Sequence, residues 1–190
     1  MSWKGRLGWA LARVVQTVGA ASAAPRRHLD ERERRILEAI FGPALDTGAI
    51  EVREALEGLI NVSRRAFVIE NTMYLPLPVR AVPTHLLVHE ATHVWQFQNG
   101  GHAYITDSLA AQSFGDGYQL EKGLLQGRSW AELNCEQQAT LVEHAWEQGC
   151  FEGRPLVIRG GDWTHAFDAA RTEWRAGRGA AFTSAGTRGR

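Results

Sequence analysis

The sequence predicts an α+β fold for a single modest domain. Apolar residues recur at helical spacing in several segments, and short segments typical of strands lie between residues 50 and 75. A third observation is that one helical segment carries two histidines four residues apart. The chain has 190 residues, of which 44% are hydrophobic, and this suits one globular core. We expect a small sheet with a hairpin over the histidine-bearing helix, and a later helix that completes the site.

The first half of the domain is expected to contain a helix followed by strands. The helix runs from about Glu31 to Phe41 and ends before Gly42-Pro43, a pair that stops helices. Four short segments read as strands, the last two as a hairpin around Asn71: residues 50–52, 59–62, 66–69 and 72–75. Near the end of the domain, a short helix is expected around Trp163 to Arg175.

Charge is distributed unevenly along the chain. The 21 acidic residues balance the 21 basic ones, but every acidic residue lies between Asp30 and Glu173. We therefore expect a basic N-terminal segment (1–27), an acidic domain (28–176) and a disordered basic tail (177–190) rich in Gly, Ala and Thr. Few aromatic residues accompany the terminal arginines, so we do not expect nucleic acid as a partner. The two cysteines form no disulfide framework and are expected to be reduced.

Residues 1–25 allow two interpretations. An apolar stretch follows Lys4 and Arg6, and the Ala-rich residues up to 23 resemble a signal-peptide cleavage site. Arg13 interrupts the apolar stretch, however, and favours an amphipathic helix that packs on the domain, contacts a membrane surface peripherally or binds a partner. No segment is long and apolar enough to span a bilayer.

The most informative segment is the helix expected from about Thr84 to Gln98. Pro83 suits a helix start, and the Gly100-Gly101 pair suits its end. Within it, His89, Glu90 and His93 form a His-Glu-x-x-His pattern between apolar residues. Such flanks argue against the alternative of a solvated helix that happens to carry two histidines.

This spacing is suited to metal chemistry. Residues four apart lie on one helix face, so His89 and His93 can present two imidazoles to one zinc ion. Glu90 is rotated by about 100° from His89, so it can reach a water beside the metal without being a ligand. His85 lies one turn earlier and is expected to be a surface or supporting residue rather than a ligand.

A third ligand must come from elsewhere in the chain, because catalytic zinc sites usually have three protein ligands. The commonest extension of the pattern has Gly and His where this chain has Gln96 and Asn99, so that extension is absent. A later helix is the other source. Ser129 and Glu132 read as a capping box that opens such a helix, and Gly149 closes it.

Two glutamates flank the apolar stripe of that helix. We expect Glu136 to be the third ligand, because a carboxylate beside a buried face is costly unless it is paired or metal-bound. Glu143 is the alternative ligand, or it holds a histidine ligand in the required tautomer. Glu136 as an ordinary solvated glutamate is the remaining interpretation. His144 points further round the helix and either assists in the site or caps the helix end.

These motifs resemble those of gluzincin-type zincin metallopeptidases, and more closely those of small bacterial zincin-like proteins described as Vgr-related, which occur with type VI secretion and similar injection systems. The resemblance implies that His89, His93 and Glu136 are zinc ligands and that Glu90 is the catalytic carboxylate. Thr140 departs from the acidic residue often found there. The resemblance extends over these segments: Leu29-Asp30-Glu31, Ile40-Phe41-Gly42, His89 to Gln96, Tyr118, Glu136 to Ala139 and His144-Ala145.

The expected function is a zinc metallopeptidase, with Zn²⁺ as cofactor and a peptide or protein as substrate. Glu90 acts as general base for the attacking water. Tyr118 is the first candidate for stabilising the oxyanion, with His144 and Tyr104 as others. In a zincin-like architecture an edge strand pairs with an extended peptide, and the hairpin's second strand (72–75) is the candidate; a strand that only covers the helix is an equal alternative.

Two other functions are open at this point. One is a non-catalytic zinc-binding component or adaptor of a secretion or injection apparatus, and the other is a secreted effector hydrolase. We expect the protein in the cytoplasm, open to export through a secretion system. If residues 1–23 are a signal peptide, it is periplasmic instead.

Overall fold

The computed structural model describes residues 25–54, 66–76, 78, 80, 82–102 and 119–180. These residues form a mixed helix-and-sheet structure, which confirms the α+β prediction. The N-terminal helix or signal segment, the strand at 59–62, Tyr104 and Tyr118 all lie outside the described residues. In chain order the longer helices are α2 (Glu31–Phe41), α3 (Thr84–Gly100), α5 (Leu120–Leu125), α6 (Cys135–Glu147) and α7 (Thr164–Arg175).

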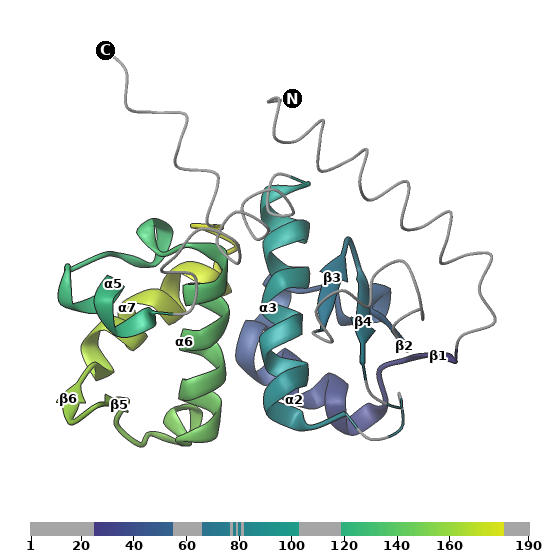
Figure 1. Cartoon of the computed structure of the whole chain (residues 1–190), viewed down its shortest axis with the longest axis horizontal. Coiled ribbons are helices and arrows are strands. Elements are labelled where there is room, and N and C mark those ends of the chain that lie inside the picture. The colour runs from purple at the N-terminus through teal and green to yellow at the C-terminus, as the bar shows by residue number, and fades with distance from the viewer. Residues whose placement is uncertain are drawn as a thin grey trace, which may run out of the picture.

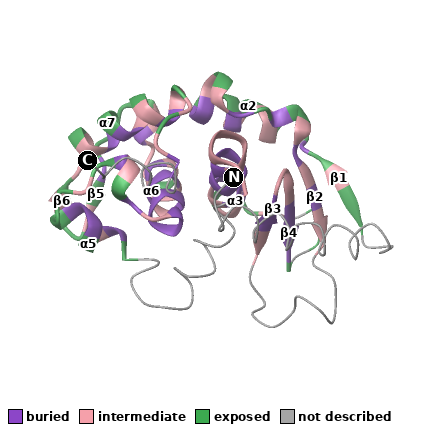
Figure 2. Cartoon of the chain, turned by 90° about the horizontal axis from the view of Figure 1, so that it is seen from above, coloured by how far each residue is buried: buried purple, intermediate pink, exposed green. Residues whose placement is uncertain are grey.

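Helices α3 and α6 pack side by side at the centre of the molecule (Figure 1). They run antiparallel, because His89 early in α3 contacts Glu143 late in α6, and Gln96 late in α3 contacts Cys135 at the start of α6. Viewed from above, α3 lies between α6 and the sheet, with α2 along one side (Figure 2). No helix among the described residues has the length and apolar character needed to cross a membrane.

The main sheet has four strands in the order β1-β2-β4-β3. Strands β3 and β4 form the predicted antiparallel hairpin, and β2 pairs parallel with β4. The prediction that the hairpin's second strand is the edge strand was wrong, because β4 lies between β2 and β3, and β3 is the edge strand beside α3. The parallel pairing that buries β4 joins residues about twenty positions apart, and hairpin periodicity carries no information about it. The bounds of the strands are Arg26–His28 (β1), Glu51–Glu54 (β2), Phe67–Ile69 (β3) and Thr72–Leu75 (β4).

Three of the predicted helices form where the sequence placed them. Helix α2 begins with a capping box in which Asp30 accepts from the Glu33 backbone, and it ends before Gly42 as expected. Helix α3 begins at Thr84 and continues two residues beyond the predicted end. Helix α7 matches the last predicted helix within one residue.

The helix that carries Glu136 begins later than predicted. Ser129 and Glu132 do form a capping box, but it caps only a 3-10 turn, η3 (Trp130–Glu132). The next residue, Leu133, has an extended backbone. A second capping box of Asn134 and Gln137 then starts α6. The two capping boxes begin five residues apart, at Ser129 and at Asn134, and only the second is followed by a continuous α-helix. The helix ends at Glu147, and Gly149 instead precedes a further 3-10 turn, η4 (Cys150–Glu152).

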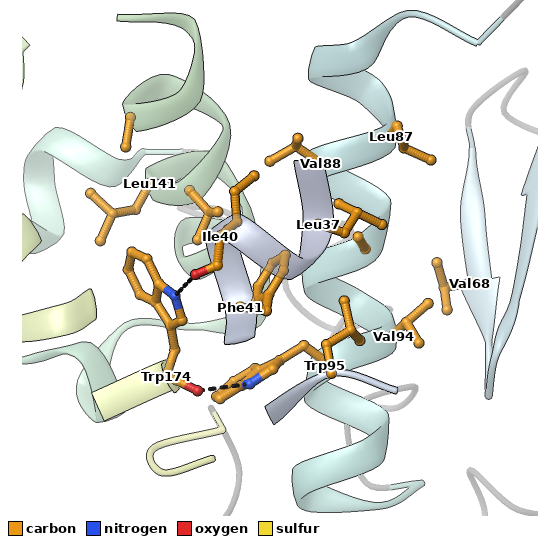
Figure 3. Packing of buried hydrophobic residues seen from close by; sticks show 14 of the residues in the cluster. Leu37, Ile40, Phe41, Val68, Leu87, Val88, Val94, Trp95, Leu141 and Trp174 are labelled. Carbon is orange, nitrogen blue, oxygen red and sulfur yellow. Dashed lines mark hydrogen bonds between the residues drawn. The ribbon is translucent and has the colours of Figure 1, made fainter. Parts of the chain in front are cut away.

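The core extends from the sheet past α3 to α2, α6 and α7, and its tryptophans lie where α3, α2 and α7 meet. Trp95 of α3 donates to the Trp174 carbonyl over 3.0 Å, and Trp174 of α7 donates to the Ile40 carbonyl over 3.1 Å (Figure 3). These bonds satisfy the indole N–H groups of two fully buried tryptophans. Both cysteines are free and buried; Cys135 is the first residue of α6, and Cys150 lies in η4.

Residues 177–180 belong to the packed domain, whereas the sequence placed them in a disordered tail. The Trp130 indole donates to the Arg178 carbonyl over 3.1 Å, and Ala180 is buried. A minor antiparallel pair, β5 (Val157–Ile158) and β6 (Gly161–Asp162), precedes α7. Composition predicted disorder for residues 177–190; residues 178–180 contact η3, and residues 181–190 lie outside the described residues.

Candidate metal centre

The two histidines of the sequence motif lie one turn apart on the face of α3 that meets α6. Their ring centroids are 5.2 Å apart with an interplanar angle of 73°. His93 is buried and His89 is nearly so, and the apolar neighbours Val88, Ala91 and Val94 are fully buried. The apolar flanks seen in the sequence therefore do place this helix inside the domain.

Glu136 approaches the two imidazoles from the first turn of α6. Its Oε2 lies 3.5 Å from Nε2 of His89 and 3.5 Å from Nε2 of His93, and the residue is only 1% exposed. The three potential ligand atoms lie within 4.8 Å of one another. The structure thus brings together the three residues predicted as ligands, and this group could hold a metal ion.

The chemistry of this donor set fits zinc. Two imidazole nitrogens and one carboxylate oxygen form a set used by catalytic zinc sites, which keep a fourth position open. Among the described residues, Glu90 Oε2 is buried without a hydrogen-bond partner, so one carboxylate oxygen beside the two histidines has unused acceptor capacity. Burial raises the pKa of Glu90, which favours a carboxyl group able to take up and release a proton.

In the metal-free protein the two histidines bind protons strongly. Burial alone would lower the pKa of His89, but hydrogen bonds to Glu136 and Glu143 outweigh burial and raise it to about 10. For His93, burial is likewise outweighed by the Glu136 carboxylate, so its pKa is raised too. A bound cation would take the place of these protons between the imidazoles and Glu136.

The Nδ1 atoms of both histidines have hydrogen-bond partners on the side away from Glu136. Nδ1 of His89 lies 2.8 Å from Glu143 Oε2, the position proposed from the sequence as an alternative ligand or a support for a histidine. The bond to His89 outweighs partial burial and lowers the pKa of Glu143. Nδ1 of His93 lies 2.8 Å from Gln96 Oε1 in the buried interior. Glu143 therefore supports a histidine in this geometry and is not part of the ligand group.

The remaining predicted site residues are not among these contacts. His144 is half-exposed, and its Nδ1 lies 3.7 Å from Glu147 Oε2. His85 is exposed on the first turn of α3, consistent with a surface residue. Tyr118, the first candidate for oxyanion stabilisation, falls outside the described residues.

Sequence reasoning missed the supporting role of Gln96 and its partner Gln138. Both amides are fully buried, and Gln96 Nε2 donates to Gln138 Oε1 over 3.0 Å. The available signal was a polar residue one turn after His93 in an otherwise apolar stretch of helix.

Comparison with known proteins gives one curated relative with significant similarity. It is the type VI secretion system spike protein VgrG2b of Pseudomonas aeruginosa (strain PAO1), 26% identical over 141 residues. The match covers 68% of this chain but 14% of the length of VgrG2b, so the chain corresponds to a small part of that protein. No protein-family model matches the chain, and no solved structure matches it significantly. The similarity supports a link with secretion systems.

Proposed function

We propose that this chain is a zinc-dependent metallopeptidase of the zincin type that hydrolyses peptide bonds in peptide or protein substrates. The observation that carries the proposal is the convergence of His89, His93 and Glu136 beside the buried Glu90. Both histidines and Glu136 would hold the ion. This arrangement leaves Oε2 of Glu90 buried without a described hydrogen-bond partner, which suits a general base.

The site residues have different roles in the proposed hydrolysis. A zinc ion held by His89, His93 and Glu136 would supply a Lewis acid that lowers the pKa of an attacking water and polarises the scissile carbonyl. Glu90 Oε2 accepts the proton of that water and delivers it to the leaving nitrogen, and its raised pKa favours the protonated intermediate state. Tyr118, and after it His144, are proposed to donate to the developing oxyanion.

A second candidate is a zinc-binding component of a secretion apparatus without catalytic activity, and the similarity to a type VI spike protein favours it. The same similarity is compatible with an effector hydrolase exported by such a system. Both candidates have a secretion-apparatus partner, and both are compatible with a cytoplasmic protein that is exported. A fourth protein ligand on the zinc would favour the non-catalytic candidate, because catalytic sites keep a position open.

The test uses the full chain loaded with zinc, its Glu90→Gln variant and a peptide-library cleavage assay. We expect Glu90→Gln to keep one zinc per chain and to lose at least about 100-fold in cleavage rate, the usual contribution of a general base. Glu38→Gln is the matched control, because Glu38 lies on α2 and contacts Thr47 instead of the site.

Undiminished cleavage by Glu90→Gln would contradict the assignment of the base. Zinc binding by a wild-type chain that cleaves nothing in the library would favour the non-catalytic candidate.

A further inference from the structure

Two fully buried glutamines join the candidate metal centre to the C-terminal part of the domain. Gln96 lies on α3 and Gln138 on α6, and neither side chain is accessible to solvent. A buried primary amide is costly unless its donors and acceptor are paired. Here each amide nitrogen has two acceptors and each amide oxygen has a donor or a histidine nitrogen next to it.

Backbone carbonyls determine the direction of every hydrogen bond in this pair. Gln138 Nε2 lies 2.8 Å from the Trp130 carbonyl and 2.7 Å from the Gly179 carbonyl, and carbonyl oxygens can only accept. The nitrogen of Gln138 must therefore face them, and its oxygen faces Gln96. Gln96 Nε2 then donates to that oxygen and to the Cys135 carbonyl over 2.9 Å, so Gln96 Oε1 faces His93.

This direction determines the tautomer of His93. Its Nδ1 lies 2.8 Å from Gln96 Oε1, which has no proton to give, so Nδ1 carries the proton of the neutral imidazole. Nε2 is then left with a free electron pair, and it faces Glu136 Oε2 at 3.5 Å. An imidazole in this state is ready to ligate a cation through Nε2.

We propose that Gln96 and Gln138 form a relay that positions His93 as a metal ligand, and that residues 178–180 are part of this positioning through the Gly179 carbonyl. The inference rests on the metal binding in the proposed function but does not require catalysis. Neither glutamine contacts the ion, so both are positioning residues. The relay makes the order of the C-terminal segment a determinant of metal affinity.

The segment is held where the relay needs it. A Cβ at Gly179 would lie 2.5 Å from Trp130 Cδ1, and the backbone there has a φ of +77°, a conformation that glycine adopts without strain. The Trp130 indole also donates to the neighbouring Arg178 carbonyl. Two carbonyls thus stand at the end of the relay: that of Trp130, eight residues before Gln138 in the sequence, and that of Gly179, 41 residues after it.

The alternative is that the glutamines only join α3, α6 and the C-terminal segment mechanically. That alternative predicts loss of stability without a specific effect on the metal. Gln137 offers a matched control, because it is equally buried on the same helix, but its side chain pairs with the Asn134 backbone and the Gln119 carbonyl. Replacing it removes a buried amide without removing a partner of the relay.

The experiment compares the full-length wild type with Gln96→Met, Gln138→Met and Gln137→Met. Zinc affinity is measured by competition with a chromophoric chelator, and the stability of the metal-free chains by urea unfolding. We expect zinc affinity to fall by about 10- to 100-fold in Gln96→Met and Gln138→Met, the range for partners of histidine ligands. Gln137→Met should lose stability and keep its zinc affinity within about threefold.

A second readout reports on the tautomer itself. In the zinc-loaded wild type, nitrogen-15 NMR should show His93 protonated at Nδ1, with a proton that exchanges slowly with solvent. Gln96→Met should exchange this proton faster at unchanged zinc occupancy, because its acceptor is gone. Cleavage is not needed for either readout, so an inactive but zinc-binding chain would overturn the peptidase proposal and leave the relay supported.

Equal zinc affinities in Gln96→Met, Gln138→Met and Gln137→Met would overturn the relay, as would a His93 proton on Nε2. A wild type that binds no zinc would overturn the relay together with the proposed function.

Discussion

The two histidines of the candidate centre are supported in opposite ways. Behind His89 stands the carboxylate of Glu143, partly exposed and late in α6, at 2.8 Å. Behind His93 stands the neutral amide of Gln96, fully buried, at the same distance. Both arrangements hold a proton on Nδ1 and direct Nε2 toward Glu136, so two different environments produce the same ligand geometry.

The difference lies in charge and in solvent. A carboxylate strengthens the basicity of His89 and can exchange partners with water, whereas a buried amide adds little charge but holds a fixed direction. We infer that Glu143 acts on zinc affinity through the basicity of His89, whereas Gln96 acts on it by fixing the tautomer and the direction of His93.

The largest expected effect comes from Glu136, which faces both histidines. Glu136→Gln keeps the volume but replaces a charged ligand by a neutral amide, so zinc affinity should fall by more than about 100-fold, beyond the range for supporting residues. Chelator competition measures it. A zinc affinity equal to that of the wild type would show that Glu136 is not a ligand and that the two histidines act without it.

The next test gives both histidines a neutral amide as the partner of Nδ1. Glu143→Gln places a neutral amide behind His89, and we expect zinc affinity to fall by about tenfold. In combination with Gln138→Met, the two losses should multiply to within about a factor of two, because the residues act on different histidines. Chelator competition on the single and double variants measures this. A double variant no worse than either single one would mean that the two supports are not independent.

The charge difference also predicts a pH dependence for the metal-free chain. Because the pKa of His89 is raised from 6.5 to about 10, the folded state binds its proton more tightly than the unfolded state. This stabilisation is fully present below pH 6.5 and is lost as the pH rises toward 10. Urea unfolding with a chelator present should therefore show a declining stability over this range, and a shallower decline in Glu143→Gln.

With zinc the dependence has the opposite sign, because ligation requires deprotonated imidazoles and zinc affinity rises with pH. If the stability of the metal-free chain declines equally steeply with pH in the wild type and in Glu143→Gln, the role assigned to Glu143 is contradicted.

The smallest effect is expected at Gly179, where the relay from His93 ends. Gly179→Ala places a methyl group against Trp130 at a positive φ, and should cost about 1–2 kcal/mol of folding free energy. Zinc affinity should fall only a few-fold, since the carbonyl of residue 179 shifts but is not removed. Gly153→Ala, at a positive φ with no atom near the added methyl group, is the control for backbone strain alone. Identical zinc affinities in the two variants would show that residue 179 has no part in the relay.

Local patterns predicted most of the helices and the grouping of His89, His93 and Glu136. The apolar flanks of His89 and His93 indicated a buried helix, and the structure has one. Glu136 was chosen because a carboxylate at the edge of an apolar stripe needs a partner, and it lies 3.5 Å from both imidazoles. The three residues lie together as helical spacing and the cost of burying charge indicated, and their role as metal ligands stays a prediction.

The errors concern contacts between distant residues. The parallel pairing of β2 with β4 makes β3 the edge strand, and the contacts of Trp130 order residues that composition assigned to a tail. The relay from His93 to Gly179 joins three segments, and nothing in the neighbourhood of Gln96 or Gln138 in the sequence indicates the pairing. The first residue of α6 was misplaced because two capping boxes follow each other, and only tertiary packing selects between them.

The most direct test of the metal centre is X-ray absorption at the zinc edge on the zinc-loaded full-length chain. We expect one zinc per chain with two imidazole ligands and further oxygen ligands at about 2.0–2.2 Å, and no sulfur at about 2.3 Å. One of these oxygen ligands should be lost or lengthened in Glu136→Gln. A sulfur ligand, a single imidazole or a spectrum unchanged in Glu136→Gln would contradict a centre built from His89, His93 and Glu136.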